Sequence, residues 1–174
     1  MNQDWYSIWN KKDRLNSLIL DFMLKADGFD SPTGQFPINI WEKYTSEMYE
    51  LMGIKSGDQI LEIGCGSGAF LYPLYLQNIN VTGVDYSKEL IDIAKKFFVN
   101  SNFYFSDALD FVNSETKLYN YVFSHSVFFY FPDLNYSEKV LNRMIDLSKN
   151  KVMVMDICDA DKEELYKKDR IEKY

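Results

Sequence analysis

Alternating glycines and nearby carboxylates are the residues whose spacing first indicates a binding site. The stretch Gln59-Ile-Leu-Glu-Ile-Gly-Cys-Gly-Ser-Gly68 has the pattern of a buried strand that runs into a glycine turn and then a helix. Glycine has no side chain and tolerates positive φ, so such a turn lets backbone approach a ligand closely. Free backbone N–H groups at the start of the helix favour an anionic ligand group above it. The stretch therefore predicts a ligand-binding loop.

Asp85 is the second chemical signal. It lies about twenty residues beyond the glycines and follows Asn80-Val-Thr-Gly-Val84, which has the composition of a strand. In a nucleotide-binding fold this spacing places a carboxylate where it accepts hydrogen bonds from both hydroxyls of a ribose. A carboxylate suits two donors because its oxygens only accept. A helix N-cap or an exposed charge is the alternative role.

Two further side chains follow later strand-like segments. His125, the single histidine, comes after the apolar segment Tyr119-Asn-Tyr-Val-Phe123. A neutral imidazole there could remove a proton from an acceptor hydroxyl or amine, although a lone histidine often has a structural role only. Asp107 could contact a ligand or cap the helix that follows it. No Cys and His residues have the spacing of a zinc site, so we expect no metal.

Composition narrows the function. The chain has 174 residues and a net charge of −7, which argues against binding to a nucleic-acid backbone. Its two cysteines, Cys65 and Cys158, indicate no disulfide framework and favour a reducing cytoplasm. The start lacks the pattern of a signal peptide. The apolar runs are shorter than the roughly 20 residues of a membrane helix. We therefore expect one cytoplasmic domain without a membrane or nucleic-acid partner.

The elements that must position these residues alternate along the chain. Strands are expected over 59–63, 80–84, 102–105, 119–123 and 151–155, with helices between them. This order predicts an α/β fold with a Rossmann-like, doubly wound, mostly parallel sheet and helices on both faces. Ligands of such sheets bind beyond the carboxyl ends of the strands.

Helices expected over 1–26 and 38–52 precede the sheet, and the end of the chain is strongly charged. We therefore expect a single domain over 1–174. It would comprise a helical cap over 1–54, an α/β core over 55–158 and a charged segment, expected to be helical, over 159–174.

The stretch Leu61-Glu-Ile-Gly-Cys-Gly-Ser-Gly68 resembles the first motif of class I S-adenosylmethionine-dependent methyltransferases of the small-molecule type. Asp85, Asp107 and the segment after the fourth strand fall where that family keeps its later motifs, and the resemblance covers about 56–157. It implies S-adenosylmethionine as methyl donor, S-adenosylhomocysteine as product and a small-molecule acceptor. Charge complementarity between Glu62 and the ligand's ammonium and sulfonium agrees with this.

The resemblance also implies which residues form the site. Glu62 would position the glycine loop and the ligand's amino-acid end, Asp85 would bind the ribose, and Asp107 and Ala108 would face the adenine. The full set of expected cofactor contacts is Glu62, Gly64, Cys65, Gly66, Gly68, Asp85, Tyr86, Ser87, Asp107, Ala108 and Ser124. The expected residues of the acceptor side and of a lid over it are Trp5, Tyr6, Trp9, His125 and Phe128.

Two features depart from the family pattern. Ser124-His-Ser126 stands where many N-methyltransferases carry Asn or Asp, two prolines and an aromatic residue, which argues against a nucleobase or protein-amide acceptor. The family fold usually continues into a sixth and a seventh strand, and these last strands are missing from the predicted elements.

Two alternatives stay open on the sequence. Gly64, Gly66 and Ala69 satisfy a loose Gly-x-Gly-x-x-Ala pattern, and Asp85 would serve NAD equally well, so an NAD(P)-dependent oxidoreductase is one alternative. Glu62, Gly68 and the helices before the first strand argue against it. The other is a non-catalytic S-adenosylmethionine-binding module, which would keep Asp85 and the glycines but lack an acceptor pocket.

Overall fold

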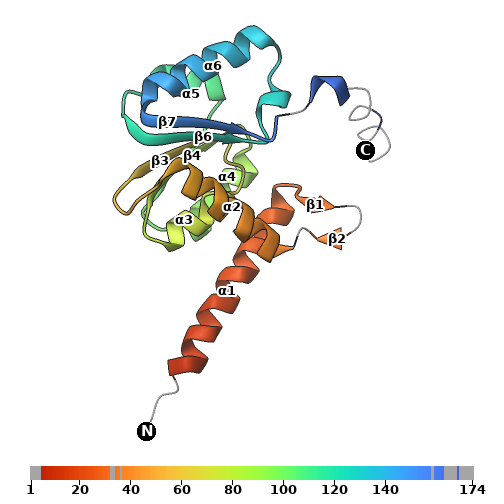
Figure 1. Ribbon diagram of the computed structural model, residues 1–174, viewed down its shortest axis with the longest axis vertical. Helices are drawn as coiled ribbons and strands as arrows, with labels where there is room; N and C mark the ends of the chain where they lie inside the picture. Colours follow the sequence, from red (N-terminus) through yellow and green to blue (C-terminus); the bar gives the residue numbers. More distant parts are fainter. Residues whose placement is uncertain (1–4, 32–33, 36, 158, 163–167, 169–174) are drawn as a thin grey trace.

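The computed structural model describes the backbone of residues 5–31, 34–35, 37–157, 159–162 and 168, and side chains within 14–29, 37–157, 159, 161–162 and 168. The described part forms one main parallel sheet, flanked by helices (Figure 1).

The main sheet has five strands in the order β5-β4-β3-β6-β7. All four neighbouring pairs are parallel. The strands are β3 (Gln59–Ile63), β4 (Asn80–Asp85), β5 (Asn102–Phe105), β6 (Tyr119–His125) and β7 (Ser148–Met155). The chain runs outward from β3 through β4 to β5, then returns to the other side of β3 with β6 and β7. This reversal creates a switch point beside β3, where α/β sheets bind ligands.

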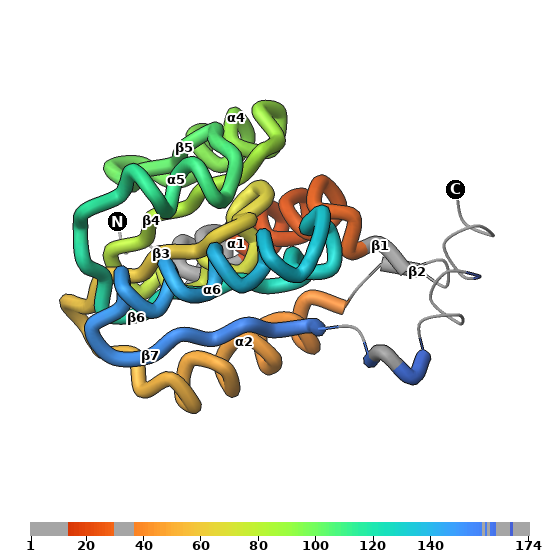
Figure 2. The backbone as a smooth tube through the Cα atoms, turned by 90° about the horizontal axis from the view of Figure 1, so that it is seen from above, coloured from red at the N-terminus to blue at the C-terminus, as the bar shows by residue number. Residues whose placement is uncertain are grey.

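Helices cover both faces of the sheet, which confirms the predicted fold class (Figures 1 and 2). Successive strand residues point to opposite faces, so Ile60 joins one buried cluster and Leu61 the other. The first cluster contains side chains of α1 (Trp5–Ala26), α2 (Ile38–Met52), α3 (Tyr72–Leu76) and α4 (Lys88–Phe97). The second contains side chains of α5 (Ala108–Ser114) and α6 (Leu134–Leu147).

The C-terminal part of α1 packs against the body of the protein through Leu20, Met23 and Leu24, all buried. Its N-terminal part projects away from the body (Figure 1). A turn at Asp27 and Gly28 follows, and then a two-stranded ribbon of β1 (Asp30–Ser31) and β2 (Gly34–Gln35). In the described part of the chain, no helix is long and apolar enough to cross a membrane.

Several element boundaries differ from those expected. The strand expected to begin at Lys151 begins at Ser148, because Ser148 pairs with Tyr119 on the neighbouring strand. The helix that was expected to follow the glycine turn directly, from Ala69, starts at Tyr72. Of the charged segment over 159–174, a short 3-10 helix η2 (Ala160–Lys162) is described, and most of the helix expected there lies outside the described residues.

Candidate functional site

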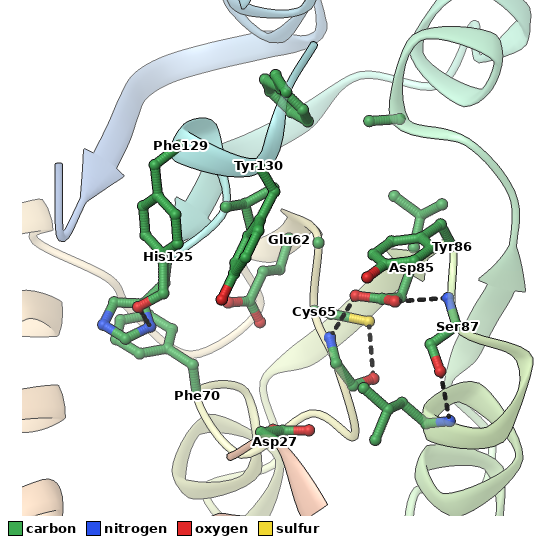
Figure 3. A pocket seen from close by; sticks show the side chains of 18 of the residues that line it. Asp27, Glu62, Cys65, Phe70, Asp85, Tyr86, Ser87, His125, Phe129 and Tyr130 are labelled. Atoms are coloured by element: carbon green, nitrogen blue, oxygen red, sulfur yellow. Dashed lines mark hydrogen bonds between the residues drawn. The ribbon is translucent and has the colours of Figure 1, made fainter. Parts of the chain in front are cut away.

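A cavity of about 730 Å³ lies at the carboxyl ends of β3, β4 and β6 (Figure 3). Its walls come from the turn at 27–29, the glycine loop, the loops that follow β4, β5 and β6, and Asp156 after β7. The cavity therefore lies at the switch point of the sheet, where the strand order and the glycine motif predicted a ligand site.

The glycine loop adopts backbone that requires glycine at two positions facing this cavity. Gly64 and Gly66 have φ of 74° and 54°. A Cβ on Gly64 would lie 2.2 Å from Cγ2 of Val127, and one on Gly66 would lie 2.6 Å from Oδ1 of Asp27. Neither position has room for a side chain, because Val127 and Asp27 pack directly against the loop.

The first three N–H groups of the loop donate to β4. Gly64 and Cys65 donate to the carbonyl of Val84, at 2.8 and 3.0 Å. Gly66 donates to Oδ2 of Asp85 at 2.8 Å. These bonds tie the loop to the strand that carries Asp85.

The remaining loop N–H groups are also satisfied within the protein. Ser67 donates to Oδ1 of Asp27 at 2.6 Å. Gly68 donates to the carbonyl of Cys65 at 2.9 Å. The expectation that this loop offers free N–H groups to a ligand anion was therefore wrong. The anions that these N–H groups bind are carboxylates of the protein itself, Asp27 at Ser67 and Asp85 at Gly66.

Asp85 ends β4 as expected and lines the cavity. It is 7% exposed, and its two oxygens accept from the N–H groups of Gly66 and of Ser87, the latter at 2.7 Å (Figure 3). The pKa of Asp85 is raised by burial, and the hydrogen bonds from these backbone donors offset part of that rise. Each carboxylate oxygen has a second lone pair, so Asp85 can accept further hydrogen bonds from a ligand.

Glu62 lines the same cavity and is 2% exposed. Its Oε2 has no hydrogen-bond partner in the protein. Burial raises the pKa of Glu62 well above its ordinary value, and the neighbouring charges of Asp27 and Asp85 raise it further. A buried oxygen without a partner costs stability, and a donor or cation supplied by a ligand would satisfy it.

Asp27 also lines the cavity, although no sequence pattern indicated it as a site residue. Burial raises its pKa from 3.8 to about 7, against the lowering effect of donors on Ser67 and Ala69. It lies in a segment rich in turn-forming residues, 40 positions before its partner Ser67. No local pattern joins these two segments, so the sequence carried no signal for this contact.

Asp107 caps α5, with Oδ1 accepting from the N–H groups of Leu109 and Asp110 at 2.9 and 3.2 Å. The hydroxyl of Tyr136 donates to the same oxygen at 2.7 Å. Asp107 therefore caps α5, which is the alternative role that the sequence suggested for it. Asp107 and Ala108 also line the cavity, so a contact with the adenine stays a prediction.

Tyr86 and Ser87 follow Asp85 at the rim of the cavity. Tyr86 is 75% exposed, which leaves its ring free to pack against a ligand. The Ser87 hydroxyl caps α4 by accepting from the N–H of Leu90 at 3.4 Å. Cys65 also lines the cavity, and burial raises the pKa of its thiol.

His125 lies on the aromatic side of the cavity, with its ring stacked on Phe70 at 5.1 Å between centroids. Burial lowers its pKa to about 4, so the imidazole is neutral at pH 7. The Ser126 hydroxyl donates to Asp156 at 2.6 Å and lies 3.3 Å from Nδ1 of His125. This arrangement favours the proton on Nδ1 and leaves Nε2 as the acceptor. The low pKa makes His125 a weak base, and its catalytic role stays a prediction.

Three expected site residues do not line the cavity. Gly68 faces the core, where a Cβ on it would lie 2.7 Å from the ring of Phe98. Ser124 is fully buried and donates to the carbonyl of Ile63 at 3.0 Å, away from the cavity. Phe128 is partly buried and packs on Phe131 and against the second buried cluster, and its neighbour Phe129 lines the cavity instead. The side chains of the expected lid residues Trp5, Tyr6 and Trp9 lie outside the described residues.

A methyltransferase-domain family model matches residues 54–173 of this chain. This match covers more than half of the sequence, so the chain belongs to the methyltransferase-domain family. The family assignment agrees with the resemblance found in the glycine motif.

Individual relatives are more distant. The "O-methyltransferase rstn1" of Aspergillus nomiae is 27% identical over 109 residues, which are 56% of this chain and 48% of that protein. An uncharacterised Haemophilus influenzae protein is 33% identical over 54 residues, 31% of this chain and 20% of that protein. The chain thus spans less than half the length of these curated relatives.

Solved structures share the fold. Magnesium protoporphyrin IX methyltransferase from Synechocystis PCC 6803 with bound S-adenosylhomocysteine matches with a TM-score of 0.62 and 15% identity, over 89% of this chain and 78% of that one. N-methyltransferase NodS from Bradyrhizobium japonicum WM9, in complex with S-adenosylhomocysteine, matches with a TM-score of 0.56 and 21% identity, over 66% and 60%. At these identities the likeness establishes the fold.

Proposed function

We propose that this chain binds S-adenosylmethionine and transfers its methyl group to a small-molecule acceptor. The observation that carries the proposal is the cavity at the switch point, in which the glycine loop, Asp85 and Glu62 come together. A buried, unpartnered Glu62 oxygen fits a ligand that lies close to the loop and carries positive charge.

Each part of the ligand has a candidate partner. Asp85 would accept hydrogen bonds from the ribose hydroxyls, and Asp107 and Ala108 would face the adenine. Glu62 would stabilise the positively charged amino-acid end. The ligand supplies an electrophilic methyl carbon on a sulfonium. The protein's part is to align that carbon with an acceptor atom and to exclude water.

The acceptor would occupy the aromatic side of the cavity, next to Phe70, Phe129 and Tyr130 (Figure 3). Flat apolar rings suit a small, partly apolar molecule. The net charge of −7 supports a small molecule over nucleic acid. His125 is the candidate to take a proton from the acceptor. The cysteine content supports the cytoplasm as the proposed compartment.

The first test is thermal unfolding with S-adenosylhomocysteine and, separately, with NAD. A ligand at about one hundred times its dissociation constant stabilises a protein by roughly 2.7 kcal/mol. We expect stabilisation by S-adenosylhomocysteine alone. Stabilisation by NAD alone would instead favour an oxidoreductase, and no effect of either ligand would contradict the proposal. Binding without methyl transfer to any of a panel of aromatic alcohols and amines would favour a non-catalytic binding module.

A further inference from the structure

Asp27 holds a position over the glycine loop that the family motif does not explain. It lies before residue 54, outside the segment matched by the family model. Its Oδ1 accepts from the N–H of Ser67 at 2.6 Å, and the Ser67 hydroxyl donates to the carbonyl of Met23 at 3.2 Å. These two bonds fix the end of α1 to the loop, with the carboxylate of Asp27 directly over Gly66.

The charge around Asp27 is not balanced within the protein. Asp27, Glu62 and Asp85 surround the same opening (Figure 3). No lysine or arginine lines the cavity among the described residues. The Oε2 of Glu62 is buried without a partner. A site of this kind offers hydrogen-bond acceptors and negative charge, and the loop N–H groups that could bind an anion are already satisfied.

We propose that Asp27 binds the α-ammonium group of S-adenosylmethionine and S-adenosylhomocysteine. The inference rests on the proposed function and extends the binding site to the helical cap. An ammonium has three donors and no acceptor, so it matches a surface of carboxylate oxygens. Asp27 is already held by backbone donors, and little further ordering is needed when the ligand arrives.

The ionisation of Asp27 gives this contact a pH signature. Burial raises the pKa of Asp27 to about 7, and a bound ammonium lowers it again because opposite charges favour the ionised form. The other titratable groups facing it are the carboxyls of Glu62 and Asp85 and the thiol of Cys65. We therefore expect affinity to increase from pH 6 to pH 8, with protons released on binding, and Asp27→Asn to reduce both effects.

The experiment is calorimetric titration of wild type and Asp27→Asn with three adenosine ligands. S-adenosylhomocysteine carries the ammonium and the carboxylate. 5′-Deoxy-5′-(3-aminopropylthio)adenosine keeps the ammonium alone, and 5′-methylthioadenosine has neither group. We expect Asp27→Asn to lower the affinity for the two ligands that carry the ammonium by about 10- to 100-fold, the range of a charge-assisted hydrogen bond. The affinity for 5′-methylthioadenosine should change by no more than about twofold. Asp58→Asn is the matched control, since Asp58 also accepts a backbone N–H, from Lys55 at 2.7 Å.

The outcomes separate this inference from the proposed function. An equal loss of affinity for all three ligands would show that Asp27 only positions the loop. Unchanged affinity for all three would show that Asp27 does not contact the ligand. Either result overturns the assignment while wild-type binding of S-adenosylhomocysteine upholds the proposed function. If wild type binds none of the three, the proposed function itself fails. Binding of 5′-methylthioadenosine by the variant also serves as the check that it is folded.

Discussion

Asp27→Asn is expected to stabilise the ligand-free protein and to lower its affinity for S-adenosylhomocysteine. The pKa of Asp27 is about 7 in the folded chain against an ordinary value of 3.8. Between these two pH values the folded chain holds a proton that the unfolded chain has released, so the free energy of unfolding falls as pH rises. The contribution of protonated Asp27 to the free energy of unfolding is fully present below pH 3.8, declines up to about pH 7 and is lost above it.

The size of this effect follows from that interval. Each pH unit is worth about 1.36 kcal/mol, so ionised Asp27 destabilises the folded protein by about 4 kcal/mol at most above pH 7. Asparagine cannot ionise. The advantage of Asp27→Asn should therefore grow by about 2 kcal/mol between pH 5.5 and pH 8, or roughly 4–8 °C in Tm for a chain of this size. Removing the Asp27 charge also removes one of the neighbouring charges that raise the pKa of Glu62.

The assay is urea unfolding of wild type, Asp27→Asn and the control Asp58→Asn at pH 5.5, 6.5, 7.5 and 8.5. The control corrects for the loss of one negative charge from an acidic chain. A stability difference that does not change with pH, or a variant less stable than wild type at pH 8, would refute the reasoning. Saturating S-adenosylhomocysteine should reduce the difference in free energy of unfolding between Asp27→Asn and wild type at pH 8, because its ammonium would offset the charge of Asp27 in the wild type.

Three further substitutions test the rest of the site. Asp85→Asn should weaken S-adenosylhomocysteine binding by about 1.5–3 kcal/mol in calorimetry, since the ribose hydroxyls lose a charged acceptor; unchanged affinity would exclude the ribose role. Gly64→Ala places a Cβ 2.2 Å from Val127 at positive φ, so the free energy of unfolding should fall by about 1–3 kcal/mol and ligand-induced stabilisation should be lost; a variant as stable as wild type would argue against this loop geometry. His125→Gln should slow methyl transfer in steady-state kinetics without changing cofactor affinity, and an unaltered rate would leave the histidine a structural role only.

The sheet could be predicted because its signals are local. Apolar segments of four to eight residues between turn-forming residues indicated each strand, and the helices between them required parallel neighbours. The position of Asp85 followed from the same reasoning, because a residue at the carboxyl end of a strand next to the glycine loop must lie near the switch point. The start of β7 at Ser148 was missed because it depends on pairing with Tyr119, a contact made only in the folded sheet.

The assignments at the end of β6 and in the segment after it show where local patterns are insufficient. Ser124 and His125 are adjacent in sequence, and in a strand adjacent side chains point to opposite faces. One of them must face away from the cavity, and the structure gives that position to Ser124, which donates to Ile63. In a similar way, Phe128 packs against the second buried cluster, whereas Phe129 lines the cavity. An aromatic run in the sequence does not show which ring faces which side.

Asp27 illustrates the physical reason that the glycine motif alone misdescribed this site. The motif correctly predicted a turn with room for a ligand, and from its N–H groups it predicted an anionic partner. For the N–H of Ser67 the helical cap supplies that partner through Asp27, 40 positions away in sequence. Gly66 donates to Asp85, and the N–H groups of Gly64, Cys65 and Gly68 donate to backbone carbonyls. With the N–H groups satisfied in this way, the cavity presents carboxylates to its ligand. It is therefore suited to select positive charge, and the repulsion it carries when empty becomes attraction for a cation.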